Sequence, residues 1–187
     1  TDYAPDQGIQ AEFFDTRLRY YDSDNKLVLQ KMDVIDIFSI SAMNRFFMPV
    51  SWKVSTGVKR IPDKKGDHGY AAFLNTGAGL AFHDNKLGLG YLFIEPEINI
   101  GDSLYDKYAI GLGVSAGWLK KLSPLWKAHF FARKLWFEPE DGHTRSEISL
   151  AQEIILEKNH HINFTVSWKE FYGHGRGEGM LAWHIYF

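Results

Sequence analysis

The chain ends in Met180-Leu-Ala-Trp-His-Ile-Tyr-Phe187, a stretch in which large apolar residues alternate with other residues. Leu181, Trp183 and Ile185 share one parity, and the residues between them are small or carry a polar group. Side chains that alternate with a period of two lie on opposite faces of a β-strand. The stretch therefore predicts a final strand with one apolar face, and the fold depends on how often the rest of the chain repeats it.

The composition favours one domain rich in β-structure. The chain has 187 residues, a net charge of −2 and 24% charged residues, so nothing indicates binding to nucleic acid. The aromatic share of 16% is high for a soluble domain, and 17 glycines with 6 prolines suit a sheet with many turns. Cysteine is absent, which excludes a disulfide framework, a thiolate metal site and a cysteine nucleophile within these residues.

Membrane helices and a signal peptide are not visible in the sequence. No apolar run approaches the length of about 20 residues that a membrane helix needs. A membrane-spanning sheet stays possible, because its strands alternate and contain no such run. Thr1 is predicted to be a processed or truncated start, because no signal peptide precedes the first strand.

The alternation of the final stretch recurs about ten times along the chain. The predicted strands cover residues 8–21, 26–40, 50–59, 70–82, 87–93, 108–118, 126–133, 148–156, 162–169 and 180–187. Short turns at 83–86, 122–125 and 157–160 alternate with longer polar loops at 62–69, 101–106, 138–145 and 173–179. An even number of strands with both ends on the short-turn side is the usual plan of a single-chain outer-membrane barrel.

Two parts of this pattern are less regular. In the strand at 87–93, the alternate residues Leu89, Tyr91 and Phe93 oppose glycines and form the predicted apolar face. Pro96 cannot donate a ladder hydrogen bond, so pairing is expected to weaken there. The register of the first two strands stays open, because either parity of residues 34–38 places a charge or a large apolar group on the unexpected face.

The strand at 108–118 gives the clearest alternation. Tyr108 and Trp118 stand at the two ends of its apolar face, and glycine, alanine and serine occupy the other face. Ten residues of tilted strand span roughly 25 Å, the height of the apolar band of an outer-membrane barrel between its aromatic girdles. The predicted lipid-facing girdle consists of Trp52, Tyr70, Phe82, Tyr108, Trp118, Trp126, Trp168 and Trp183.

Two architectures share this alternation, a soluble ligand-binding barrel and a membrane barrel. Small residues would fill a soluble barrel's interior poorly and would leave the aromatic face in water. We therefore predict an all-β fold, a closed antiparallel transmembrane β-barrel of about ten strands (8–12) in an up-and-down meander, forming a single domain over residues 1–187. The expected location is the Gram-negative outer membrane, with both termini periplasmic and with outer-membrane lipid and lipopolysaccharide as partners.

The end of the chain also resembles the closing strand of outer-membrane barrels. In such strands the terminal aromatic residue belongs to the signal that the barrel insertion machinery reads. By this resemblance Trp183, Ile185 and Phe187 form a C-terminal insertion signal.

Charged residues take the parity of the predicted lumen. A ten-stranded barrel is narrow, and unpaired buried charge is costly, so these groups must pair with one another or meet water. Two alternatives follow, a salt-bridged plug that stiffens the barrel and a thin polar channel. The predicted lumen network consists of Lys53, Lys127, Arg133, Glu147, Glu153, Lys169 and His184.

A hydrolase on the barrel wall is an alternative to a non-enzymatic barrel. Lipid hydrolases of this kind combine serine, histidine and an acidic or amide group on the barrel wall. The candidates are His143 with Ser146, Glu147 and Ser149, or Ser167 with His184 on the adjacent strand. The parity of Ser167 and His184 places them in the lumen, away from acyl chains, and we predict no catalytic residue in this chain.

Histidines and glycines in the predicted loops give no further site. His160, His161 and His174 lack an acidic partner at the spacing that a metal site requires. The stretch from Gly173 to Gly179 lacks the strand–turn–helix context of a phosphate-binding loop, so a flexible hairpin is predicted. No metal and no cofactor are expected.

Four stretches carry a more particular resemblance. They are Asp6-Gln-Gly-Ile-Gln-Ala-Glu-Phe-Phe14, Leu18-Arg-Tyr-Tyr21, Asp33-Val-Ile-Asp-Ile37 and Arg45-Phe-Phe-Met-Pro-Val-Ser-Trp-Lys53. They resemble the C-terminal barrel of Gram-negative envelope proteins whose upstream domain is a periplasmic papain-like cysteine hydrolase of the Lnb N-terminal type. The resemblance implies that the catalytic cysteine lies upstream of Thr1. It also implies that the barrel anchors or assists this periplasmic hydrolase domain.

Overall fold

The part of the chain that the computed structural model describes contains ten strands in one sheet, in which each strand pairs antiparallel with the next and the end of the second strand also pairs in parallel with the fourth. The structure describes residues 7–21, 25–43, 47–62, 68–102, 104, 106–138, 143–157 and 160–185. The strands are β1 (Gln7–Tyr21), β2 (Lys26–Met43), β3 (Ser51–Pro62), β4 (His68–Asp84), β5 (Gly88–Ile100), β6 (Tyr108–Ser123), β7 (Trp126–Glu138), β8 (Thr144–Glu157), β9 (His160–Phe171) and β10 (His174–Ile185).

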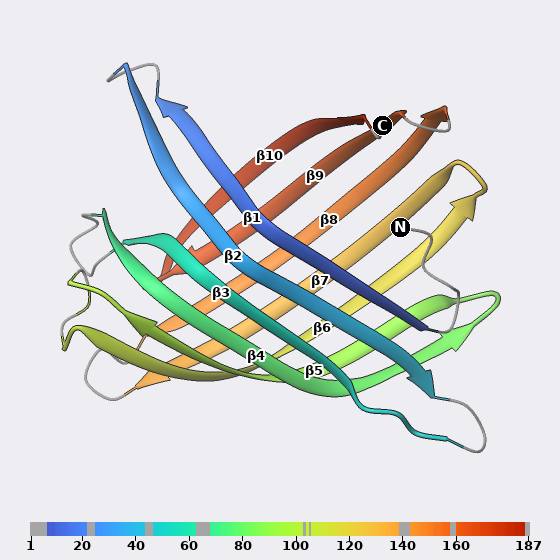
Figure 1. Cartoon of the computed structure of the whole chain (residues 1–187), viewed down its shortest axis with the longest axis horizontal. Helices are drawn as coiled ribbons and strands as arrows, with labels where there is room; N and C mark the ends of the chain where they lie inside the picture. Colours follow the sequence, from blue (N-terminus) through green and yellow to red (C-terminus); the bar gives the residue numbers. More distant parts are fainter. Residues whose placement is uncertain are drawn as a thin grey trace.

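The sheet forms an open, strongly curled half-barrel (Figure 1). In Figure 1 the first strands lie in front of the last ones and cross them, and the sheet turns back on itself through its middle strands. Its concave side therefore faces inward between the two halves. Among the described residues, no helix is long and apolar enough to cross a membrane.

The predicted all-β meander of ten antiparallel strands is confirmed, but the predicted closure is wrong for this structure. β1 and β10 are the two edges of the sheet, and no pairing joins them in the described part of the chain. The reason is that alternation specifies the two faces of a strand and leaves its partner undetermined. The edge strand β1 is also irregular, because Phe14 has a φ of 58° and the pairing with β2 shifts between Arg17 and Leu18.

A β-bulge sets the register that the sequence left open. Asp33 pairs with Gly57 and Ile35 with Thr56, so Val34 is an extra residue in β2 relative to β3. A bulge of one residue exchanges the faces of all residues beyond it. Asp33 before the bulge and Asp36 after it can therefore both face the concave side, which strict alternation forbids.

The two faces of the sheet differ sharply in burial and polarity. Along β6 the apolar residues of the predicted outer face are exposed, and the glycines, Ala109 and Ser115 between them are buried. β5 shows the same alternation with the opposite parity to the prediction, because Leu89, Tyr91 and Phe93 are buried. The outer face of β5 carries Leu92, Ile94, Ile98 and Ile100 instead.

Pro96 weakens the pairing of β5 with β4, as predicted. The partners Ala78–Ile94 and Asn75–Glu97 follow one register, and the ladder to β4 is interrupted between them. The ladder on the other side of β5 continues through Pro96, which is opposite Leu112. The strand therefore extends well beyond Phe93 and carries further residues to the concave face.

Two apolar clusters fill the concave face toward its two ends. The first lies toward the short turns and consists of Ile40, Ala42, Ala81, Leu89, Tyr91 and Phe93, with Phe38, Leu119 and Phe131 packed against it. The second lies toward the long loops and consists of Ile61, Ala71, Leu104, Ala109, Leu135 and Phe137, with Phe171 packed against it.

Aromatic rings cover two of the inward glycines of β6, Gly111 and Gly117. A Cβ on Gly117 would lie 2.1 Å from the Tyr91 ring, and one on Gly111 would lie 2.5 Å from the Phe137 ring. The glycines therefore make room for large side chains of the neighbouring strands, and the small residues of this face do not leave it empty.

The glycine-rich stretch after residue 173 forms a strand, and the predicted flexible loop is wrong. Tyr172 and Gly173, with φ values of 51° and 78°, form a tight turn between β9 and β10. The ladder begins directly after it, with His174 opposite Phe171. Positive φ at both central residues is the geometry of a two-residue hairpin, so the hairpin expected here turns at Tyr172 and Gly173 and does not extend over the whole stretch to Gly179.

Candidate functional site

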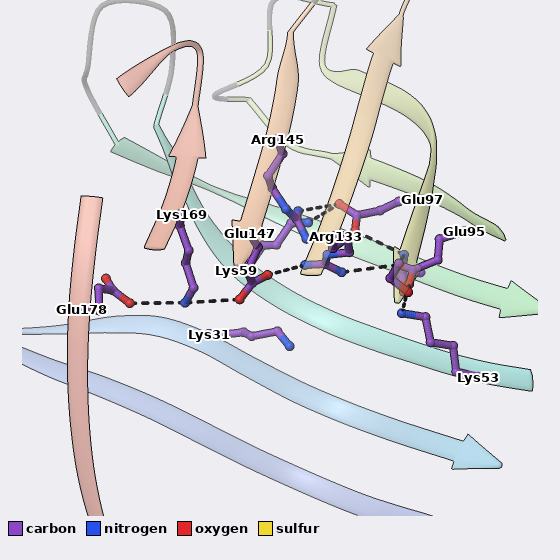
Figure 2. Close-up of polar contacts among 12 residues, drawn as sticks. Lys31, Lys53, Lys59, Glu95, Glu97, Arg133, Arg145, Glu147, Lys169 and Glu178 are labelled. Atoms are coloured by element: carbon purple, nitrogen blue, oxygen red, sulfur yellow. Dashed lines mark hydrogen bonds and ion pairs between the residues drawn. The ribbon is translucent and has the colours of Figure 1, made fainter. Parts of the chain in front are cut away.

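A network of charged side chains crosses the middle of the concave face, between the two apolar clusters (Figure 2). β5 shows this layering directly, because Tyr91 and Phe93 belong to the first apolar cluster and Glu95 and Glu97 follow on the same face. We call this network the ionic belt, and its members are Lys53, Lys59, Glu95, Glu97, Arg133, Arg145, Glu147, Lys169 and Glu178.

Glu97 is the centre of one half of the ionic belt and is only 1% exposed. Arg145 from β8 binds it with both terminal nitrogens, at 2.8 Å from Nη1 to Oε1 and 3.3 Å from Nη2 to Oε2. Lys59 from β3 donates to Oε1 at 2.5 Å. The amides of Asn75 and Asn99 also donate to Glu97, at 3.4 Å and 3.1 Å. One carboxylate thus links strands that are far apart in the sheet.

Glu95 is the centre of the other half and is fully buried. Lys53 from β3 forms an ion pair with it, and the hydroxyl of Ser115 donates to it. Arg133 from β7 lies 3.6 Å from Glu95 and also donates to Glu147 at 2.9 Å. Arg133 on β7 therefore connects Glu95 on β5 with Glu147 on β8.

The ionic belt continues to the edge of the sheet. Lys169 on β9 lies 3.8 Å from Glu147 and 3.2 Å from Glu178 on β10, and Figure 2 shows these contacts in sequence. The contacts alternate in sign from β3 to β10, so each charge meets an opposite one. Burying a charge is costly unless it is paired and hydrogen-bonded, and this arrangement meets both conditions. The belt can act as a cross-brace that holds the curl of the sheet.

Comparison with known families matches residues 2–186 to a domain of unknown function (DUF7840). The chain belongs to the DUF7840 family. No curated protein and no solved structure matches the chain. The family description assigns no activity, so the geometry of the DUF7840 chain carries the functional argument.

The structure brings four of the seven predicted lumen residues into the ionic belt, namely Lys53, Arg133, Glu147 and Lys169. Two more of the predicted residues, Lys127 and Glu153, lie in a separate cluster. Glu153 is 3.6 Å from Lys127 and 2.7 Å from Nδ1 of His161. The side chain of His184 lies outside the described residues.

Sequence reading missed four central members of the belt, Lys59, Glu95, Glu97 and Arg145. A signal for the two glutamates was present, because the alternation of β5 continues beyond Phe93. Ile94, Ile98 and Ile100 take the parity of the exposed convex face, and Glu95 and Glu97 take the opposite one. The interruption expected at Pro96 ended the predicted strand too early.

All eight predicted girdle residues lie on the exposed convex face. Their exposed fractions run from 41% for Trp52 and Trp126 to 65% for Trp183. Trp136 shares this face and was missed. Of the predicted insertion signal, Trp183 is described and exposed, whereas the side chain of Ile185 and all of Phe187 lie outside the described residues.

The structure does not bring Ser167 and His184 together. Ser167 pairs with Glu178, and His184 pairs with His161. The two residues are therefore six positions apart along the ladder, which corresponds to about 20 Å.

The candidates His143 and Glu147 have other partners in the structure. The buried imidazole of His143 lies between two aromatic rings. Its centroid is 4.6 Å from the centroid of the Phe137 ring and 4.3 Å from the centroid of the Tyr172 ring. Ser146 and Glu147 are adjacent and face opposite sides of β8, and Glu147 binds Arg133. Within the described residues, no group of three or more histidine, aspartate or glutamate side chains could hold a metal ion.

Proposed function

We propose that this protein is embedded in the Gram-negative outer membrane, with its convex face against lipid, and that it anchors or assists a periplasmic domain. The observation that carries this proposal is the inversion of polarity between the two faces. The concave face buries glutamate, lysine and arginine, and the convex face exposes leucine, isoleucine, valine, phenylalanine and tryptophan. A water-soluble domain has the reverse arrangement, because apolar side chains leave water when the chain folds.

The size of the apolar surface favours lipid as its partner. Exposed large apolar side chains occur on all ten strands. Monomeric soluble proteins rarely expose continuous apolar patches larger than a few hundred Å². Lipid covers such a surface on every side at once, whereas one protein partner would cover part of it.

The course of the apolar band across the sheet supports a tilted membrane arrangement. Ala116, Ala132, Ile148 and Trp168 form one row of directly opposite residues across β6 to β9, and the row is apolar throughout. The next row contains Val114, Lys134, Ser146 and Glu170, so it begins apolar and ends polar.

Strands of membrane sheets are tilted by about 35–45° from the bilayer normal. A row of opposite residues runs perpendicular to the strands, so in a tilted sheet its members lie at different depths in the bilayer. Such a row passes from the apolar band into the polar interface. The change from Val114 to Glu170 along one row is the pattern that this geometry requires.

The filled interior favours an anchor over the alternative of a narrow polar channel. An apolar cluster lies on each side of the ionic belt, and the belt side chains are paired across the curl. The apolar clusters thus occupy the two ends of the concave face, and the paired charges of the ionic belt occupy its middle. The link to a periplasmic hydrolase rests on the sequence resemblance, and the coding sequence upstream of Thr1 is the place to look for that domain.

A membrane-embedded sheet requires partners for its two edge strands. The hydrocarbon core of a bilayer supplies no hydrogen-bonding group, and each unsatisfied backbone group there costs several kcal/mol. β1 and β10 are the edges of the DUF7840 sheet. Their outward backbone groups must therefore be covered when the protein is in a bilayer.

Hydrogen exchange of the protein in lipid vesicles tests this requirement. Backbone amides of β1 and β10 are expected to exchange as slowly as those of β6, which is paired on both sides. Rapid exchange along β1 and β10, with slow exchange in β6, would show that the edges stay open to water. That result would contradict an embedded sheet.

A further inference from the structure

Three lysines gather on the short-turn rim of the sheet, where β4 ends and β5 begins beside the end of β6. Lys86 lies in the turn, and Lys120 and Lys121 lie in the last part of β6. We call them the rim lysines. Gly88, with a φ of 95°, packs against the backbone of β6, where a Cβ would lie 3.2 Å from Cα of Lys120. The turn is therefore held close to the strand that carries the other two lysines.

Local hydrogen bonds fix this turn. The carboxylate of Asp84 accepts the N–H groups of Lys86 at 2.8 Å and Leu87 at 2.9 Å. These two bonds hold the pKa of the exposed Asp84 carboxyl below its ordinary value. The indole N–H of Trp118 donates to the carbonyl oxygen of Leu87 at 2.6 Å. Asp84 is thus engaged with the backbone of its own turn.

The rim lysines lack ion-pair partners among the described residues, in contrast to the cations of the ionic belt. Lys121 also lies directly opposite Lys127 in the ladder between β6 and β7. Like charges at directly opposite positions destabilise a sheet. Lys127 has Glu153 within 3.6 Å, so the unbalanced positive charge is on Lys121.

Apolar and aromatic groups surround these charges. Nζ of Lys120 lies 5.7 Å from the centroid of the Trp118 ring, and Leu87, Leu122 and Leu125 are exposed nearby in sequence. Tryptophan prefers the headgroup level of a bilayer, and lysine can lay its alkyl stem on apolar surface while its ammonium reaches water. The rim thus combines groups that suit the boundary between acyl chains and headgroups.

We propose that the rim lysines bind the phosphodiester headgroups of anionic glycerophospholipids. This inference rests on the proposed membrane function and adds the class of lipid and the place where it binds. A negatively charged phosphodiester would balance the excess charge on Lys121 and its neighbours, and a zwitterionic headgroup supplies no net charge. A lysine close to an anionic membrane surface contributes roughly a fivefold preference.

The test compares spin-labelled phosphatidylglycerol with spin-labelled phosphatidylcholine in vesicles that contain the full chain. Lipid in contact with the protein gives a motionally restricted signal, and the ratio of the two lipids in this signal measures selectivity. The native chain is expected to favour phosphatidylglycerol by roughly tenfold or more. The triple variant Lys86→Gln, Lys120→Gln and Lys121→Gln is expected to lose most of this preference. High salt should also reduce it.

The control variant removes the same number of positive charges elsewhere, at Lys26, Lys107 and Lys134, each replaced with glutamine. It is expected to keep the preference of the native chain. Equal restriction of both lipids by the native chain, or an unchanged preference in the rim variant, would overturn the assignment while leaving the membrane proposal intact. A complete lack of restricted lipid would contradict the membrane proposal itself, and the lipid-binding assignment with it.

Discussion

Replacing Leu112 with arginine is expected to lower the stability of the bilayer-inserted protein by about 2–4 kcal/mol. Leu112 is 59% exposed and lies near the centre of the apolar face of β6, between Tyr108 and Trp118. In a bilayer this position lies in hydrocarbon, where a guanidinium group loses its hydration. The expected measurement is the free energy of unfolding in vesicles, followed by tryptophan fluorescence during denaturant titration.

The matched control is Leu122→Arg at the short-turn rim. Leu122 is also exposed on β6, so the two substitutions differ in depth and not in chemistry. Near the interface an arginine costs about 0–1 kcal/mol. If water covered the convex face, both substitutions would be surface changes worth about 0.5 kcal/mol or less. Equal small effects at the two positions would therefore contradict lipid contact.

Replacing Glu97 with glutamine is expected to cost about 3–5 kcal/mol. The substitution keeps the shape of the side chain and removes its charge. Arg145 and Lys59, which both bind Glu97, then lose their common negative partner on the buried face. An uncompensated buried charge is the reason for the large effect. The unfolding midpoint in detergent micelles measures it.

Glu138→Gln provides the matched control for Glu97→Gln, because Glu138 is exposed at the end of β7. Its expected effect is within about 0.5 kcal/mol. The triple variant Glu97→Leu, Arg145→Leu and Lys59→Met should recover much of the lost stability, because it leaves none of these three charges unpaired. Native stability of Glu97→Gln alone would contradict the role of the ionic belt as a brace.

The sequence predicted the strands and their faces best where alternation is uninterrupted. β6 follows strict alternation from Tyr108 to Trp118, and the structure exposes its apolar residues as expected. The prediction for β5 ends at Phe93 because a proline cannot donate a ladder hydrogen bond, although Pro96 interrupts the ladder of β5 on one side only. In β2 the bulge at Val34 changes the parity in mid-strand, and a single period cannot describe both halves.

The ionic belt was only partly predictable, because its pairs depend on how strongly the sheet curls. Arg145 and Glu97 lie on strands that are separated by two others in the sheet, so the alternation of β8 gives the face of Arg145 but not its partner. The open edges were unpredictable for a related reason. An edge strand and a strand paired on both sides show the same alternation, so the sequence of β10 does not reveal how many neighbours it has.

The central claim is that lipid covers the convex face, and collision accessibility of spin labels tests it most directly. The chain contains no cysteine, so single cysteines at Ile110, Leu112, Val114 and Ala116 can each carry a label without removing a native thiol. In vesicles these four labels are expected to collide often with oxygen, which concentrates in hydrocarbon, and rarely with a water-soluble nickel chelate. Frequent collisions with the nickel chelate at Leu112 and Val114 would show that water covers this face and would contradict the account.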